Sequence, residues 1–163
     1  ILHRLVWAIS AYAYFLYRQF TLIYLLYMVI AVDFDGTIVE HRYPEIGKEI
    51  PFATATLRQL IADGHELILW TVREGDLLRD AVEYCRKRGV VFFAVNRDFE
   101  EEDGTNSDFS RKIRADLFID DRNVGGLPSW STIYALINNG KTLEQHLIAQ
   151  GTLPKPKRWW WPF

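Results

Sequence analysis

Cysteine is nearly absent from this chain of 163 residues, and its scarcity limits both compartment and chemistry. Cys85 is the only cysteine, so no disulfide can form within the chain, and a reducing, cytoplasmic location is expected. Cys85 lies in the segment LLRDAVEYCRKRG, where helical spacing places it on the apolar face. We therefore interpret this thiol as a packing group rather than a nucleophile.

An excess of positive charge is also lacking. Lys and Arg total 19 against 21 Asp and Glu, which gives a formal net charge of −2. Nucleic-acid binding through bulk electrostatics is therefore not expected. Hydrophobic residues make up 49% and charged residues 25%, a composition typical of a globular protein, and the length suits a domain with one core.

Acidic residues are missing altogether from residues 1–27, an apolar segment with two arginines. A membrane-spanning helix from about Leu5 to Tyr27 would be long enough to act as an anchor. Arg18 would then lie inside the span, at a cost of roughly 2.5–3.5 kcal/mol near its centre. Two alternatives are a helix that packs on the domain and a gene start placed too far upstream, because Met28 is the only methionine. A signal peptide fits less well, since no small-residue cleavage site follows.

From Met28 onward, segments typical of buried strands alternate with segments typical of amphipathic helices. Strands are expected at residues 29–34, 66–71, 90–95 and 115–121, and helices at 51–64, 75–89, 130–140 and 141–151. The alternation predicts an α/β fold, a Rossmann-like parallel sheet with helices on both faces. We expect residues 28–151 to form this domain. Residues 152–163 form a basic and aromatic tail that folds onto the domain or contacts a membrane surface or partner.

Polar side chains follow three of the predicted strands, where each strand ends: Asp33 with Asp35, then Thr71, then Asp120 with Asp121. Ligands of such sheets bind outside the carboxyl ends of the strands. Four carboxylates at one edge repel one another unless a cation lies among them. Mg²⁺ prefers carboxylate oxygens and leaves room for a substrate phosphate, so it is the expected metal.

Three further residues favour phosphoryl transfer at this edge. The hydroxyl of Thr71 can donate to a phosphate oxygen, and Lys112 can neutralise charge on the transferring group. Gly36 allows a tight turn after Asp35, which could leave backbone N–H groups facing an anion. A carboxylate nucleophile, a metal, a cation and several donors together indicate a phosphoryl-transfer site.

The segment DFDGT at residues 33–37 resembles the first motif of the haloacid dehalogenase (HAD) superfamily, whose members are mostly Mg²⁺-dependent phosphatases. Thr71 after LILW resembles the second motif, Lys112 the third, and FIDD at residues 118–121 the fourth. The motifs occur in the family's order and cover roughly residues 28–126. The resemblance implies a HAD-like phosphatase.

The resemblance also implies a role for each matched residue. Asp33 would attack phosphorus and carry an aspartyl-phosphate. Asp35 would protonate the leaving oxygen and then activate water, which requires that it hold a proton near neutral pH. Thr71 and Lys112 would bind the phosphoryl group, with Arg111 as a rival to Lys112. The implied Mg²⁺ ligands are Asp33, the backbone carbonyl of Asp35, and Asp121 or Asp120, with Asp121 favoured.

The expected site is open, because no segment is long enough for a large cap domain. Residues 39–50 leave room for a small flap, on which His41 could touch the leaving group or lie at the surface. Arg73 could contact the substrate, although a salt bridge within its loop fits equally well. The substrate would be a small phosphorylated molecule or a larger one. Alternatives are a nucleotidase or phosphotransferase on the same scaffold, or a non-catalytic, phosphate-binding or membrane-tethered adaptor.

Overall fold

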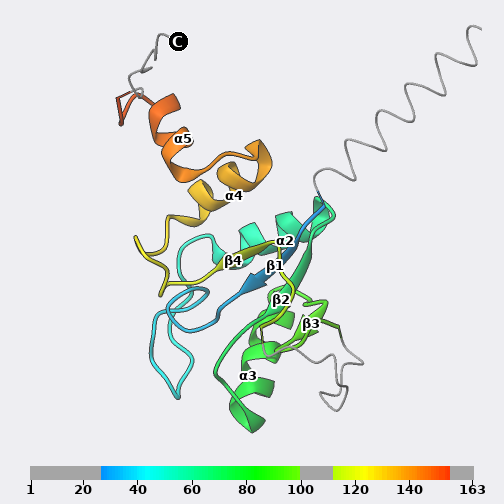
Figure 1. Cartoon of the computed structure of the whole chain (residues 1–163). Helices are drawn as coiled ribbons and strands as arrows, with labels where there is room; N and C mark the ends of the chain where they lie inside the picture. Colours follow the sequence, from blue (N-terminus) through cyan, green and yellow to red (C-terminus); the bar gives the residue numbers. More distant parts are fainter. Residues whose placement is uncertain (1–26, 100–111, 155–163) are drawn as a thin grey trace, which may run out of the picture. The chain divides into compact units, whose positions relative to one another are not determined.

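The structure is a computed structural model and describes residues 27–99 and 112–154. The chain divides into two compact units, Ile1–Leu127 and Pro128–Phe163. Among the described residues, a sheet and two helices belong to the first unit and two further helices to the second (Figure 1). The region predicted as one domain, residues 28–151, therefore contributes to both units.

The first unit is built on a parallel sheet of four strands: β1 (Val29–Val32), β2 (Glu66–Leu69), β3 (Ala94–Val95) and β4 (Leu117–Ile119). Their order is β3-β2-β1-β4, and every pair is parallel. The last residue of β1, Val32, pairs with the last residues of β2 and β4, Leu69 and Ile119. The chain therefore leaves these three strands side by side, and the predicted α/β fold with a Rossmann-like parallel sheet is confirmed.

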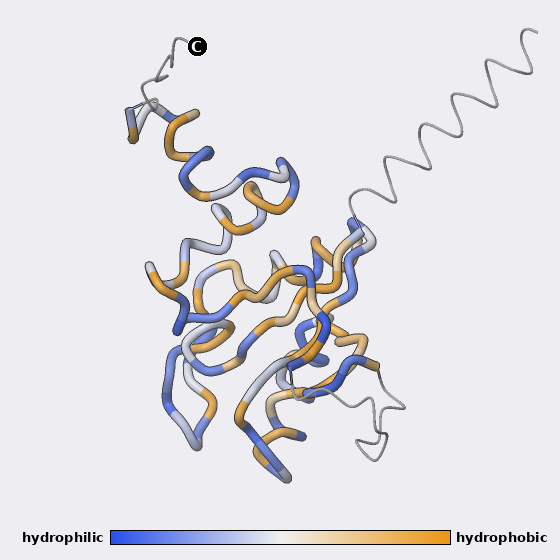
Figure 2. Tube along the Cα trace, viewed as in Figure 1, coloured by the Kyte–Doolittle hydropathy of each residue, from blue (hydrophilic) through white to orange (hydrophobic). Residues whose placement is uncertain are grey.

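The sequence of β1 is hydrophobic throughout and that of β2 after its first residue (Figure 2), as expected for strands buried on both faces. Ile30, Val32, Leu67 and Leu69 are fully or almost fully buried and share one face by the alternation of the strand. The opposite face carries a second apolar cluster, formed by Ala31, Ile68, Ala94 and Ile113 with Trp70 and Phe118 packed against it.

Helices α2 (Ala53–Ala62) and α3 (Gly75–Arg86) follow β1 and β2. Leu57 and Leu60 of α2 are buried, and so is Cys85 of α3. Burial raises the pKa of the Cys85 thiol to about 12, so its reactive thiolate form is suppressed and the packing interpretation is confirmed.

The two helices are neighbours, since Arg58 of α2 donates to the carbonyl of Arg88, just after α3, at 3.4 Å. Right-handed crossovers from β1 to β2 and from β2 to β3 place both helices on one face of the sheet. Helices on both faces were predicted; the helices of this unit that the structure describes account for one face.

β3 spans two residues, whereas the sequence predicted a strand over residues 90–95. It lies at the edge of the sheet and pairs with β2 alone among the described strands. Val91 and Phe93 beside it are exposed, so this part of the predicted strand gains little from burial.

The second unit contains α4 (Trp130–Asn139) and α5 (Leu143–Ala149), as the sequence predicted. The hydroxyl of Ser129 accepts from the Thr132 amide at the start of α4. Thr142 and Gln145 form a capping box at the start of α5. These local signals explain why both helices were predictable.

Several predictions concern residues outside the described part: the extension up to residue 26, Arg111, and the tail from residue 155. In residues 27–99 and 112–154, no helix combines the length and the apolar character that crossing a membrane requires.

Candidate active site

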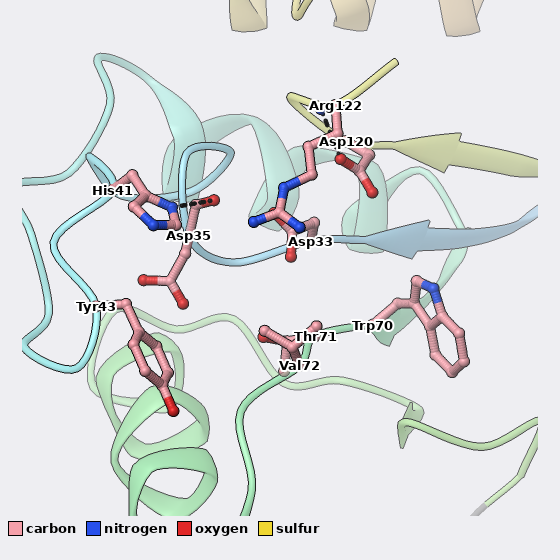
Figure 3. Close-up of a pocket in the computed structure, with 9 residues that line it drawn as sticks. All are labelled: Asp33, Asp35, His41, Tyr43, Trp70, Thr71, Val72, Asp120 and Arg122. Carbon is pink, nitrogen blue, oxygen red and sulfur yellow. Dashed lines mark hydrogen bonds between the residues drawn. The ribbon is translucent and has the colours of Figure 1, made fainter.

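A pocket of about 320 Å³ lies at the carboxyl ends of β1, β2 and β4, and Figure 3 shows its lining residues. These come from the end of β1 and the flap, from the end of β2 and from the end of β4: Asp33, Asp35, His41, Tyr43, Trp70, Thr71, Val72, Asp120 and Arg122. The structure therefore brings together the three strand ends that the sequence singled out. The pocket is small for a ligand site, which suits a small molecule.

Three acidic side chains converge beside this pocket. Asp33, Asp120 and Asp121 each offer a carboxylate oxygen, and these atoms all lie within 4.8 Å of one another. Burial raises the pKa of Asp33 to about 6, and the negative charges of Asp120 and Asp121 add to that rise. Hydrogen bonds from the Phe34 amide and the Thr37 hydroxyl act in the opposite direction. The cluster therefore carries the repulsion that a bound cation would relieve.

The donor set of this cluster fits a divalent cation. Oδ1 of Asp121 is buried and accepts no hydrogen bond from any described residue, so one lone pair is left for another partner. Asp120 also accepts the Arg122 amide at 2.8 Å. An all-oxygen set of carboxylates is typical of Mg²⁺ or a similar hard cation. Both Asp120 and Asp121 contribute an atom, and the unpaired oxygen favours Asp121 as a ligand.

Thr37 connects the two ends of the acidic cluster. Its hydroxyl donates to Oδ2 of Asp33 at 3.1 Å and accepts the amide of Asp121 at 3.0 Å. A side chain after β1 thereby connects Asp121, the second residue after β4, to Asp33. The sequence drew attention to DFDGT, but it gave Thr37 no role.

Gly36 contributes space rather than a donor. Its φ is +93°, and a Cβ at this position would overlap the carboxylate of Asp121. Its amide donates to the carbonyl of Val39 at 2.7 Å. The expectation that backbone N–H groups after Asp35 face an anion is therefore wrong for Gly36, because this N–H group closes the turn.

Asp35 forms a buried ion pair with Arg73. Nε of Arg73 donates to Oδ2 of Asp35 at 2.7 Å, and Nη2 donates to Oδ1 at 2.7 Å. The side chains are 4% and 0% exposed. Arg73 thus engages both carboxylate oxygens of Asp35. Arg73 therefore forms a salt bridge, one of the two positions expected for it, and is not among the residues that line the pocket. A substrate contact by Arg73 stays a prediction.

Arg73 also holds the flap. Its Nη1 donates to the carbonyl of Pro44 and its Nη2 to that of Glu45, both at 2.9 Å. Its guanidinium carbon lies 5.4 Å from the centroid of the Tyr43 ring. The base of the flap is closed by backbone hydrogen bonds between residues 38–40 and 48–50. Arg73 therefore ties Asp35 and the flap into one unit.

Thr71 lines the pocket as predicted, but Lys112 does not. The Thr71 amide donates to the Asn96 side chain at 2.8 Å, which fixes the position of the residue. Lys112 is exposed, and its Nζ lies 5.9 Å from the centroid of the Phe118 ring. Arg122 lines the pocket wall and Lys112 does not, while the phosphoryl-binding role of Lys112 stays a prediction.

Sequence reasoning missed Arg122 and the apolar wall formed by Tyr43, Trp70 and Val72. Arg122 directly follows the acidic pair after β4, so its place at a strand end was a usable signal. Trp70 and Val72 flank Thr71, and Tyr43 lies in the predicted flap. His41, for which two positions were weighed, lines the pocket, with Nδ1 3.5 Å from the carbonyl oxygen of Asp35.

Comparison with solved structures shows a clear relative of this chain. No protein-family model matches the chain, and no curated protein matches it. A solved structure of a conserved protein from Bacteroides thetaiotaomicron is similar to it, with 60% sequence identity and a TM-score of 0.70. The similarity covers 73% of this chain and 96% of that one.

Proposed function

We propose that this chain, which belongs to the same family as the conserved protein of Bacteroides thetaiotaomicron, has a Mg²⁺-dependent, HAD-type phosphatase activity. It hydrolyses a phosphomonoester through an aspartyl-phosphate on Asp33. One observation carries this proposal: the carboxylates of Asp33, Asp120 and Asp121 converge within 4.8 Å at the edge of a small pocket. A buried, unpaired oxygen on Asp121 supports it.

Asp33 is suited to be the nucleophile. It lines the pocket directly after β1, and Thr37 fixes the orientation of its carboxylate. With a pKa of about 6, Asp33 is mostly ionised at neutral pH even without a cation. Asp33, Asp120 and Asp121 would hold Mg²⁺, which when bound would offset the negative charge of the phosphate and of the carboxylates.

The reaction has two steps. An oxygen of Asp33 bonds to phosphorus while the bond from phosphorus to the ester oxygen breaks, and the alcohol leaves with a proton. A water oxygen then bonds to phosphorus, the bond to Asp33 breaks, and inorganic phosphate leaves. Thr71 and Arg122 line the pocket where they can bind phosphate oxygens during both steps.

Asp35 can handle the proton only after it releases at least one hydrogen bond from Arg73, because Arg73 engages both of its oxygens. Catalytic hydrogen bonds often rearrange when substrate binds. The role of Asp35 as the residue that donates the proton to the leaving oxygen and then activates water stays a prediction. A phosphotransferase would use the same first step but an alcohol in place of water.

Hydrolysis of p-nitrophenyl phosphate with EDTA, Mg²⁺ or Ca²⁺ tests the proposal. Activity is expected to disappear with EDTA and return with Mg²⁺, whereas Ca²⁺, with its larger coordination shell, restores little. Asp33→Asn should be inactive. Asp76→Asn, which changes an 80% exposed acid on α3, is the matched control and should behave as wild type. Full activity in EDTA contradicts the metal-dependent mechanism. In a separate assay with acceptor alcohols, formation of a phosphorylated alcohol would indicate phosphotransfer.

A further inference from the structure

The pocket has two chemically different sides. Asp120 and Arg122 lie on the side that follows β4, as Figure 3 shows, while Trp70, Thr71 and Val72 lie on the side that follows β2. Tyr43 of the flap completes the second side. Acids and an arginine account for the recognition of a metal and a phosphate. Metal and phosphate binding do not account for Tyr43, Trp70 and Val72. We name these three residues the apolar wall.

The apolar wall exposes hydrophobic surface at the pocket. Tyr43 is 50% exposed and Val72 is 72% exposed, although the neighbouring strand residues are buried. Single exposed hydrophobic residues are common and need no explanation. Two exposed hydrophobic residues, Tyr43 and Val72, together with the partly buried Trp70, line one pocket opposite charged groups. This arrangement is found in sites for small molecules.

The two aromatic rings of the wall are held in place before any ligand binds. Arg73 lies against the Tyr43 ring and binds the carbonyls of the next two residues, Pro44 and Glu45. Trp70 packs against the apolar cluster of the sheet, and its amide donates to Val32 at 2.9 Å. Fixed rings lose little conformational freedom when a flat group stacks on them, so they suit recognition by stacking.

We propose that the substrate is the phosphomonoester of an alcohol that carries a planar ring, with the phosphate at Asp33 and the ring against the apolar wall. This inference rests on the proposed phosphatase activity and adds the substrate class. Nucleosides and simple aryl-substituted alcohols share this chemistry. A single-ring or nucleoside-sized leaving group suits a pocket of about 320 Å³.

The first experiment compares adenosine 5′-monophosphate with ribose 5-phosphate, in Mg²⁺. Both have the same kind of primary leaving oxygen, so the comparison isolates the ring. Stacking predicts a kcat/KM that is roughly 5- to 100-fold higher for the nucleotide. A second pair, 3-phenylpropyl phosphate and propyl phosphate, separates a general preference for rings from recognition of a nucleobase. Equal kcat/KM values within both pairs overturn the substrate proposal and leave the phosphatase intact.

Variants then assign the preference to the wall. Tyr43→Ala should bring the ratio close to one, mainly through KM for the ring-bearing substrate, and Tyr43→Phe, which keeps a ring, should restore it. Phe93→Ala is the matched control, because Phe93 is also exposed, at 44%, but does not line the pocket. A ratio that survives Tyr43→Ala overturns the assignment to the apolar wall.

A binding measurement separates failure of this inference from failure of the proposed function. Calorimetry of the Asp33→Asn protein with Mg²⁺ compares the affinity for the same two ligands without any turnover. Tighter binding of the nucleotide supports the ring site even if the wild-type protein hydrolyses neither compound. Equal affinity, or no binding of either, overturns it.

Discussion

Asp33 combines two properties that a nucleophile on a metal site needs, an approach from the pocket and a carboxylate fixed by a neighbouring hydroxyl. The motif DFDGT predicted that Asp33 lies at the end of β1, where the structure places it, and its role as nucleophile stays a prediction. The partner of Asp35 was not predictable, because TVREG does not specify in which direction the long side chain of Arg73 points. The sequence allowed a salt bridge as well as a substrate contact, and only the fold distinguishes them.

We expect Asp33→Asn and Asp35→Asn to lose phosphatase activity at different steps of the reaction. Asp33→Asn removes the attacking oxygen, so no acid-stable or acid-labile phosphoenzyme forms and turnover ceases. Asp35→Asn slows hydrolysis on the order of 10²–10⁴-fold, the usual contribution of general acid–base catalysis. With p-nitrophenyl phosphate it should still be phosphorylated and then stall. Rapid-quench labelling checks this, and label on Asp33→Asn would show that another residue is the nucleophile.

The raised pKa of Asp33 predicts how stability depends on pH without a metal. Between its ordinary value of 3.8 and about 6, the folded chain holds a proton that the unfolded chain has released. Stability in EDTA therefore falls as pH rises through this window, and the loss is complete above it.

Asp33→Asn should consequently melt higher than wild type at pH 7.5 in EDTA, by about 2–4 °C for each kcal/mol relieved, with little difference near pH 4. Mg²⁺ should raise the melting temperature of wild type more than that of the variant. Scanning calorimetry across this range is the measurement. A wild-type protein that gains stability from pH 4 to pH 7 relative to Asp33→Asn would contradict the predicted direction.

At the scale of elements, the helices and the central strands were predictable because each carries a strong periodic pattern with end signals. The sequence predicted that residues 39–50 leave room for a small flap, but not how the flap is held. Its conformation depends on Arg73, which arrives from the end of β2 and binds the carbonyls of Pro44 and Glu45. Arg73 is 29 positions from Pro44 and 28 positions from Glu45 along the chain, so no local sequence pattern contains these contacts.

Removing Arg73 should loosen the flap and destabilise the fold. Arg73→Met leaves Asp35 as a buried, unpaired charge, at a cost of roughly 3–5 kcal/mol, and the double variant with Asp35→Asn should recover part of it. Urea unfolding measures the stability, and amide exchange at Glu40 and Ile50 reports on the flap. Arg86→Met, which removes an exposed ion pair on α3, should change the free energy of unfolding very little, because exposed ion pairs contribute little to stability. Equal costs for the two arginine variants would contradict the prediction.

At the scale of the whole molecule, strand order could be predicted only in part. Alternating segments imply a parallel sheet, but they do not specify that β4 lies next to β1. That position decides which acids meet. Asp120 and Asp121 follow β4, and Asp33 follows β1, so the pairing of these strands creates the cluster.

We expect a chain that begins at Met28 to fold and to keep its activity. β1 begins at Val29, and all residues proposed for the site lie after it. The amide of Met28 donates to Nδ1 of His65 at 3.2 Å, and this contact remains possible when Met28 is the first residue. A chain that begins at Val32 lacks most of β1 and should not fold. Circular dichroism and the phosphatase assay compare them, and an insoluble or inactive Met28 chain beside an active full chain would contradict the prediction.

The acidic cluster also affects the lifetime of the folded state. Asp33 and Asp121 are far apart along the chain, and their carboxylates meet only where β4 has docked against β1. In the unfolded chain these carboxylates are far apart, so their repulsion adds almost nothing to the free energy of that state. If the sheet edge forms late in folding, the repulsion speeds unfolding and leaves the folding rate almost unchanged. A cation held by these carboxylates would then slow unfolding and leave the folding rate almost unchanged. Each molecule would stay folded for longer.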